Sequence, residues 1–231
     1  MKTYRRQDLV AIVDATDHIR GPLHAPITLV EYGDFECPGS RQASGALQIL
    51  RSRYPEHVRL VFRHYPLESV HPHALTAAQA AEAAAAQGKF WQMYDRLFEY
   101  QNHLDTQHLH AYARDLGLDM ARFVAEMDDT IYLQRVREHI ESGKRSGVRA
   151  TPTFFVNSAI CDVSSGAELQ HDFLTPDEGA IIGVTQFDEW LKHASTLRAE
   201  GLHFRPEPKE PDLVTRVPPA RGPRKALSLN Q

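Results

Sequence analysis

The chain has 231 residues, 26 basic and 30 acidic side chains and a formal net charge of −4. This length fits one large domain with appendages, and the weak negative charge lacks the basic excess of a nucleic-acid-binding domain. Ten Phe, eight Tyr and two Trp supply apolar surface for a core. No apolar run approaches the roughly 18 residues of a membrane span, and residues 1–17 lack the apolar centre of a secretory signal. The composition therefore predicts a globular cytoplasmic protein without nucleic-acid or membrane partners.

The cysteines and histidines argue against a disulfide scaffold and against a metal site. Two cysteines, Cys37 and Cys161, form at most one internal disulfide, which excludes a cysteine-rich zinc module. Two histidine pairs have i, i+2 spacing, and such residues do not face each other on a helix. Neither pair belongs to a metal motif such as H-E-x-x-H. We expect no metal at these pairs, which are His71/His73 and His108/His110.

A parallel β-α-β unit is predicted near the N-terminus. An apolar run rich in β-forming residues, Ile27–Phe35, predicts a buried strand. Pro38 suits the first position of a helix, and apolar residues then recur at helical spacing. A second strand is predicted at His57–Arg63. Two strands with a helix between them imply parallel, right-handed pairing.

Helical periodicity dominates the middle of the chain. An alanine-rich stretch ends at Gly88, and a wide apolar stripe follows it. We expect these helices to form a domain of about residues 68–146, inserted beside a four-stranded sheet. The predicted helices are Ala74–Ala86, Phe90–Phe98, Leu109–Leu116, Met120–Met127 and Ile131–Ile140.

Strand character returns after residue 150. Thr151-Pro152 precedes a predicted strand at Thr153–Val156, and a last helix is predicted at about residues 185–197. Residues 158–183, which include Cys161, favour an insertion or an irregular hairpin. The order of elements predicts an α/β, thioredoxin-like fold with an inserted helical domain.

The C-terminal end differs in composition from the rest. Residues 205–231 contain six of the fourteen prolines, six basic residues and three acidic residues. Because no apolar periodicity persists there, we expect a disordered Pro/Arg-rich tail. The folded domain is then expected to span residues 1–204.

Cys37 is the candidate nucleophile, because it stands where the first strand ends and the helix begins. Chemistry in open α/β sheets collects at the carboxyl ends of strands. A helix N-terminus offers free N–H groups and the positive end of the helix dipole, which favour the thiolate. Because the thiolate is the attacking species, this placement favours a reactive cysteine over a buried inert one.

Three blocks of sequence resemble the DsbA-like family of thioredoxin-fold thiol-disulfide oxidoreductases. The family's opening strand and Phe-x-Cys-Pro-x-Cys motif are similar to DHIRGPLHAPITLVEYGDFECPGS. Its second strand and helical insertion resemble VFRHYPLESVHPHALTAAQAAEAAAAQGKFWQMYDRLF, and its Thr-Pro loop and third strand resemble SGVRATPTFFVN. The likeness covers about residues 17–157 and the last helix. Such relatives occur free and fused to membrane transporters, and nothing in the sequence indicates a fusion.

The resemblance implies roles for particular residues. Cys37 matches the attacking cysteine. Thr151-Pro152 matches a loop whose cis proline lies against that cysteine and, with Pro38 and Gly39, borders an extended substrate peptide. Glu31 matches a buried acidic residue that assists proton transfer, although an exposed position on the strand is the alternative.

Ser40 departs from the family motif, because it stands where the second cysteine is expected. A single thiol cannot clear its own mixed disulfide, although the Ser40 hydroxyl can hydrogen-bond the Cys37 thiolate. Cys161 is expected on an outer strand several strand spacings from Cys37, beyond the roughly 7 Å Cα separation of a disulfide. An external thiol such as glutathione is then the resolver, and no bound cofactor is expected.

Three functions fit these features. The first is a monothiol thiol-disulfide oxidoreductase acting on protein or peptide thiols and disulfides. The second is a glutathione-dependent transferase or isomerase, in which Ser40 activates glutathione. The third is a redox-inactive binding module that keeps the peptide groove. The sequence leaves open the physiological substrate, the reductant, whether Cys161 participates, the oligomeric state and the role of the C-terminal tail.

Overall fold

The computed structural model describes residues 9–157 and 159–160. Three sequence predictions lie outside these residues: the environment of Cys161, the last helix at 185–197 and the tail at 205–231. The extent of the folded domain, residues 1–204, likewise stays a prediction.

A mixed sheet forms the centre of the protein. The two central strands, β2 and β3, pair in parallel, with Leu29 opposite Leu60, whereas β1, β4 and β5 join by antiparallel pairing. The order across the sheet is β1 (His18–Arg20), β3 (Val58–His64), β2 (Ile27–Gly33), β4 (Thr153–Val156) and β5 (Ala159–Ile160).

The predicted β-α-β unit is confirmed, with helix α1 (Pro38–Arg53) between β2 and β3. The prediction of a four-stranded sheet is wrong, because β1 adds a strand at one edge. This strand has three residues and no apolar alternation of its own. It is held by pairing with β3, a contact that local sequence does not indicate. The strand predicted at Ile27–Phe35 is also shorter than expected. It corresponds to β2, which ends at Gly33, and Asp34 lies outside the sheet.

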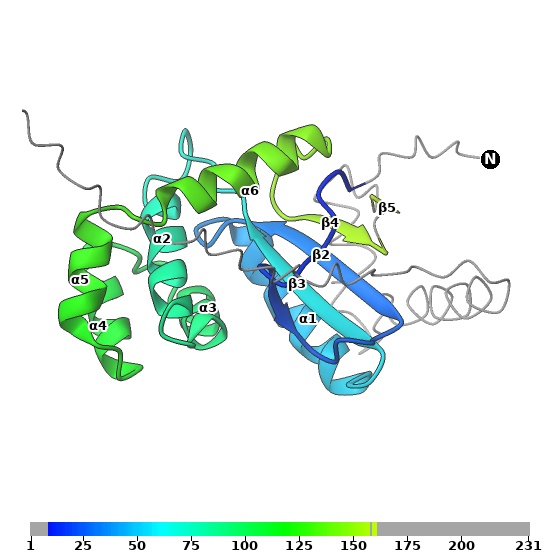
Figure 1. Cartoon of the computed structure of the whole chain (residues 1–231), viewed down its shortest axis with the longest axis horizontal. Coiled ribbons are helices and arrows are strands. Elements are labelled where there is room, and N and C mark those ends of the chain that lie inside the picture. The colour runs from blue at the N-terminus through cyan, green and yellow to red at the C-terminus, as the bar shows by residue number, and fades with distance from the viewer. Residues whose placement is uncertain (1–8, 158, 161–231) are drawn as a thin grey trace, which may run out of the picture.

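The block after β3 is helical, as predicted. Figure 1 shows α2–α5 gathered beside the sheet and α6 running from this group toward β4. No strand occurs between residues 72 and 146, all of which the structure describes. The helices are α2 (Ala74–Ala85), α3 (Phe90–Glu99), α4 (Thr106–Asp115), α5 (Met120–Asp128) and α6 (Leu133–Arg145).

The two faces of the sheet pack against different helices. Alternate residues of β2, such as Ile27 and Leu29, pack against Leu47 and Leu50 of α1. Val30 and Tyr32, on the opposite face, pack in a second cluster to which Ile140 of α6 adds. A third cluster joins Phe35 and Phe62 to the apolar sides of α2–α5. Clusters on each face make the sheet a rigid platform for the loops at its end.

Within the described part of the chain, no helix has the length and apolar character that crossing a membrane requires.

Candidate active site

Cys37 occupies the N-cap of α1 in an extended conformation, directly before Pro38. The turn that carries it is fixed on two sides. The Cys37 N–H donates to the carbonyl oxygen of Asp34 at 3.1 Å, and the Gln101 amide donates to the Cys37 carbonyl oxygen at 2.9 Å. The side chain is buried, with 8% of its surface exposed. The predicted position of the thiol at a strand-to-helix turn is therefore confirmed.

The Thr151-Pro152 loop lies against this cysteine. The peptide bond between the two residues is cis, and the Cys37 thiol donates to the Thr151 carbonyl oxygen at 3.1 Å. Gly39 lies so close that a Cβ atom would stand 3.0 Å from Pro152 Cδ and 3.7 Å from Cys37 Sγ. Residues 37–39 and 151–152, separated by more than a hundred positions, thus meet as the resemblance implied.

Ser40 is buried behind the thiol, one helical turn along α1. Its hydroxyl oxygen accepts a hydrogen bond from the Asp34 N–H at 3.2 Å. The hydroxyl therefore stabilises the turn that precedes the cysteine. A hydrogen bond from Ser40 to a Cys37 thiolate stays a prediction.

Asp34 is a site residue that the sequence reasoning missed. Its buried carboxylate accepts from the Glu36 and Leu67 N–H groups at 2.8 and 2.9 Å. It also lies 2.7 Å from Nδ1 of His71, a partly exposed side chain. These contacts tie the cysteine turn to the loop after β3. An acidic residue three positions before the candidate cysteine was the available signal, and the sequence interpretation treated His71 only as a metal ligand.

Glu31 is completely buried on the α1 side of β2, so the alternative of an exposed strand position is wrong. Neither carboxyl oxygen has a hydrogen-bond partner. Burial raises the pKa of Glu31 to about 8, and the neighbouring Tyr94 hydroxyl acts weakly in the opposite direction. The group is protonated at neutral pH and titrates close to it. Its part in proton transfer stays a prediction.

A second buried carboxyl, Glu82 of α2, is saturated with partners. One oxygen lies 2.8 Å from His18 Nε2 and 2.9 Å from His64 Nε2. The other lies 2.8 Å from Arg135 Nε. Hydrogen bonds from both histidines hold the pKa of Glu82 far below its usual value, although burial opposes them. The cluster joins β1, β3, α2 and α6.

The cluster of His18, His64 and Glu82 is the group of potential metal ligands that the described residues bring together. The sequence reasoning missed it, since its members are far apart in the chain. The Arg135 guanidinium already compensates the carboxylate, and both imidazoles already donate to it. The carboxylate of Glu82 therefore has its partners within this ion-pair network. The absence of a metal site stays a prediction.

A cysteine at the start of the first helix, beside a cis-proline loop, is the arrangement that the resemblance to DsbA-like proteins of the thioredoxin fold implied. The family model described as "Thioredoxin" matches residues 14–173, and the chain belongs to this family. The resemblance stated from the sequence and the predicted α/β, thioredoxin-like fold are thus confirmed.

Solved structures share the fold. A thioredoxin-like oxidoreductase from Silicibacter pomeroyi DSS-3 is 28% identical, with a TM-score of 0.56 over 68% of this chain and 90% of that chain. The alpha-DsbA1 protein of Wolbachia pipientis is 19% identical, with a TM-score of 0.59 over 83% of this chain and 97% of that chain. The second likeness concerns the fold alone.

Closer sequence relatives carry a different name. A protein named Na(+)/H(+) antiporter NhaA 1 from Salinispora arenicola is 41% identical over 198 residues, which are 79% of this chain and 30% of that protein. One named NhaA 3 from Salinispora tropica is 48% identical over 151 residues, 65% of this chain and 23% of that protein. The chain therefore spans less than a third of the length of these curated relatives.

Proposed function

We propose that the chain is a monothiol thiol-disulfide oxidoreductase that acts on protein or peptide disulfides through Cys37. The observation that carries the proposal is the contact between the Cys37 sulfur and the Thr151 carbonyl at the cis-proline loop. Ser40 at the fourth motif position supplies no second thiol. An external thiol such as glutathione then completes each cycle.

The reaction consists of two balanced exchanges. In the first, the Cys37 thiolate attacks a substrate disulfide, a sulfur–sulfur bond to Cys37 forms, and the other substrate sulfur leaves as a thiolate. In the second, glutathione thiolate attacks this mixed disulfide and releases Cys37. With a glutathionylated protein as substrate, the products are the protein thiol and oxidised glutathione, so glutathione supplies the electrons.

Proton movement accompanies the first exchange. The Cys37 thiol donates to the Thr151 carbonyl, so the sulfur gives up this hydrogen bond when it ionises, while the N–H groups at the start of α1 favour the thiolate. Glu31 has a pKa of about 8, which suits a group that exchanges protons near neutral pH. We propose that it takes up and returns the protons of the cycle.

The cis-proline loop supplies the docking edge. Thr151 lies two residues before β4 begins, where its backbone can pair with an extended peptide as an added strand would. Gly39 keeps the surface beside the sulfur free of a side chain, and Pro38 is exposed next to it. The proposal includes a cytoplasmic location, where glutathione is kept reduced.

The test measures deglutathionylation of a protein substrate in a Cys161→Ser background. The parent is expected to form a mixed disulfide at Cys37 that persists until thiol is added, and Cys37→Ser abolishes turnover. Ser40→Cys should release glutathione from this mixed disulfide without added thiol, because the second sulfur attacks Cys37 intramolecularly and a disulfide forms between Cys37 and the introduced cysteine. Ser44→Cys adds a thiol elsewhere on α1 and is the matched control. Turnover that survives Cys37→Ser would contradict the proposal.

A second candidate function follows from the antiporter-named relatives. We propose as the alternative that the chain is a binding module that serves a Na⁺/H⁺ antiporter; identities of 41% and 48% to such proteins support it. Co-sedimentation of the chain with vesicles that contain an NhaA antiporter, and not with empty vesicles, would favour this function. Equal partition into both kinds of vesicle would argue against it.

A further inference from the structure

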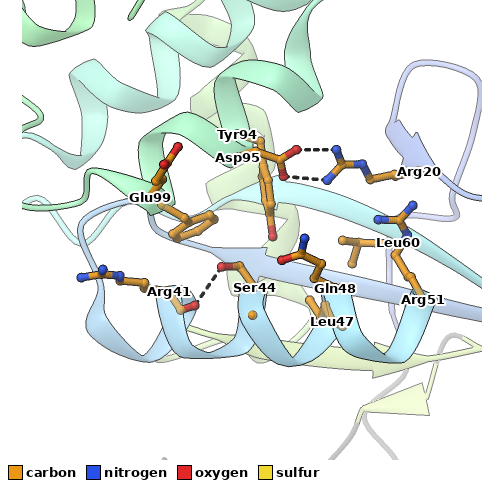
Figure 2. A pocket seen from close by; sticks show the side chains of 12 residues that line it. Arg20, Arg41, Ser44, Leu47, Gln48, Arg51, Leu60, Tyr94, Asp95 and Glu99 are labelled. Atoms are coloured by element: carbon orange, nitrogen blue, oxygen red, sulfur yellow. Dashed lines mark hydrogen bonds and ion pairs between the residues drawn. The ribbon is translucent and has the colours of Figure 1, made fainter. Parts of the chain in front are cut away.

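A pocket of about 440 Å³ lies between α1 and α3, away from the residues that surround the Cys37 sulfur. Figure 2 shows Ser44, Gln48 and Arg51 of α1 on one side and Tyr94 of α3 on the other. Leu60 and Phe98 add apolar surface. The pocket is larger than a simple inorganic anion needs and has both polar and apolar walls.

The pocket lining carries three arginines, Arg20, Arg41 and Arg51, and two carboxylates, Asp95 and Glu99, so one positive charge is in excess. Arg20 is neutralised by Asp95, with two hydrogen bonds of 2.7 and 2.5 Å. Arg51 is half-buried beside this pair, and among the described residues no carboxylate forms an ion pair with it. Burial lowers the pKa of Arg51, and the adjacent Arg20 charge acts in the same direction. A partly desolvated guanidinium next to a second one favours a bound anion.

Tyr94 supplies a second, independent observation. Its side chain is 3% exposed, and its hydroxyl is buried without a hydrogen-bond partner. Figure 2 shows this hydroxyl directed between Ser44 and Gln48, into the pocket. Burial raises the pKa of Tyr94 well above its usual value, so the group is a donor. An unsatisfied buried donor indicates a missing acceptor.

We propose that the pocket binds a small organic carboxylate. The anionic oxygens accept from Arg51 and from the Tyr94 hydroxyl, and Gln48 adds an amide donor at the rim. The hydrocarbon part lies against the apolar wall that Leu60 and Phe98 form, two side chains that are almost completely buried. The site does not depend on exchange at Cys37, which lies outside the pocket lining.

Tyr94 also connects this pocket to the buried Glu31, whose pKa it influences. The hydroxyl completes no hydrogen bond with Glu31 in this structure, since both groups are without a partner. A carboxylate in the pocket orients the hydroxyl away from Glu31, so the influence that lowers the Glu31 pKa weakens and Glu31 retains its proton more strongly.

The test is calorimetric titration of the full chain with glutarate as the probe. Glutarate is expected to bind, and Arg51→Gln should weaken binding roughly tenfold, as the loss of one charge-assisted contact implies. Arg53→Gln is the matched control, because it removes an equal charge from an exposed position on the same helix. Tyr94→Phe should weaken binding by a smaller factor, and Cys37→Ser should leave it unchanged.

Two comparison compounds define the ligand class. Neutral glutaramide should not bind, and inorganic phosphate should bind more weakly than glutarate. The proposal is overturned if glutarate does not bind, if Arg51→Gln and Arg53→Gln reduce affinity equally, or if phosphate binds as tightly as glutarate. Loss of glutarate binding in Cys37→Ser would also overturn it, because the pocket would then not be separate from the thiol site.

Discussion

Glu31 and Glu82 are both buried carboxyl groups, but the protein treats them in opposite ways. Glu31 on β2 has no hydrogen-bond partner for either oxygen, and burial raises its pKa to about 8. Glu82 on α2 has two imidazoles and a guanidinium around it, and hydrogen bonds from His18 and His64 hold its pKa far below the usual value. One group is kept neutral and the other charged.

This difference fits the proton-transfer role that we propose for Glu31 and a structural role for Glu82. An unpartnered buried carboxyl is unfavourable for folding, and such groups gather where proton transfer is needed. Glu31 precedes the Cys37 turn on the same strand. Glu82 instead joins elements that are distant in sequence, since 64 residues separate it from His18. Its full set of partners resembles the buried networks that specify how elements pack.

The largest expected effect is on stability. Glu82→Gln should lower the free energy of unfolding by about 3 kcal/mol, because it leaves buried donors and the Arg135 charge without their partner. Glu31→Gln should change it far less at pH 6, since the wild-type group is already neutral there. Urea unfolding measures both, with the exposed Glu138→Gln as control. Equal decreases in the free energy of unfolding in Glu82→Gln and Glu31→Gln would contradict the view that one carboxyl is neutral and the other charged.

The pH dependence of stability should differ in sign between the two groups. The raised pKa of Glu31 means that its stabilisation is complete below pH 4.5 and is lost as the pH rises toward about 8. The lowered pKa of Glu82 means that its contribution is present above pH 4.5 and is lost as the pH falls. At about 1.4 kcal/mol per pKa unit, the Glu31 effect is several kcal/mol at most.

Unfolding measured from pH 4 to pH 9 checks these directions. Glu31→Gln should gain stability relative to wild type as the pH rises through this range. The stability deficit of Glu82→Gln relative to the wild type should shrink as the pH falls below 4.5. A wild-type curve parallel to that of Glu31→Gln would show that Glu31 has the same pKa in the folded and unfolded states, and so that burial does not raise it.

The region near Cys37, which includes Glu31, was easier to predict from the sequence than the region around Glu82. Cys37-Pro38 and Thr151-Pro152 are short motifs whose resemblance to a known family implied both the cis bond and the contact between the two segments. The helices were predictable because their apolar residues repeat at regular spacing. In each case a local pattern carried the information.

The structure around Glu82 and along β1 could not be predicted from local patterns. His18 lies on a three-residue strand without alternation, and Glu82 lies inside an alanine-rich helix whose periodicity indicates only packing. Their contact depends on how β1 and α2 meet in the folded protein. The Asp34–His71 pair was missed for the same reason, since the loop after β3 has no motif that places it beside the cysteine turn.

A smaller effect is expected where the reactive region is most tightly packed. Gly39→Ala would place a Cβ atom 3.0 Å from Pro152 Cδ, so the loop must move slightly and alkylation of Cys37 should change a few-fold, in either direction. Gly45→Ala is the control on the same helix, because nothing lies within 4 Å of its added Cβ atom. It should stabilise α1 by about 0.5–1 kcal/mol. Identical alkylation rates in both variants would contradict the close packing of the loop.

The smallest expected effect concerns Tyr94, the single neighbour that favours ionised Glu31. Tyr94→Phe removes this donor and keeps the ring, so the Glu31 pKa should rise further above about 8, by less than the burial effect that dominates it. Carbon-13 NMR of the Glu31 carboxyl, assigned by comparison with Glu31→Gln, measures the shift. Adding glutarate to the wild type should move the same signal in the same direction, because the ligand orients the Tyr94 hydroxyl away from Glu31. A Glu31 pKa that falls in Tyr94→Phe would show that Tyr94 does not donate toward this carboxyl, and the link between the pocket and Glu31 would then be lost.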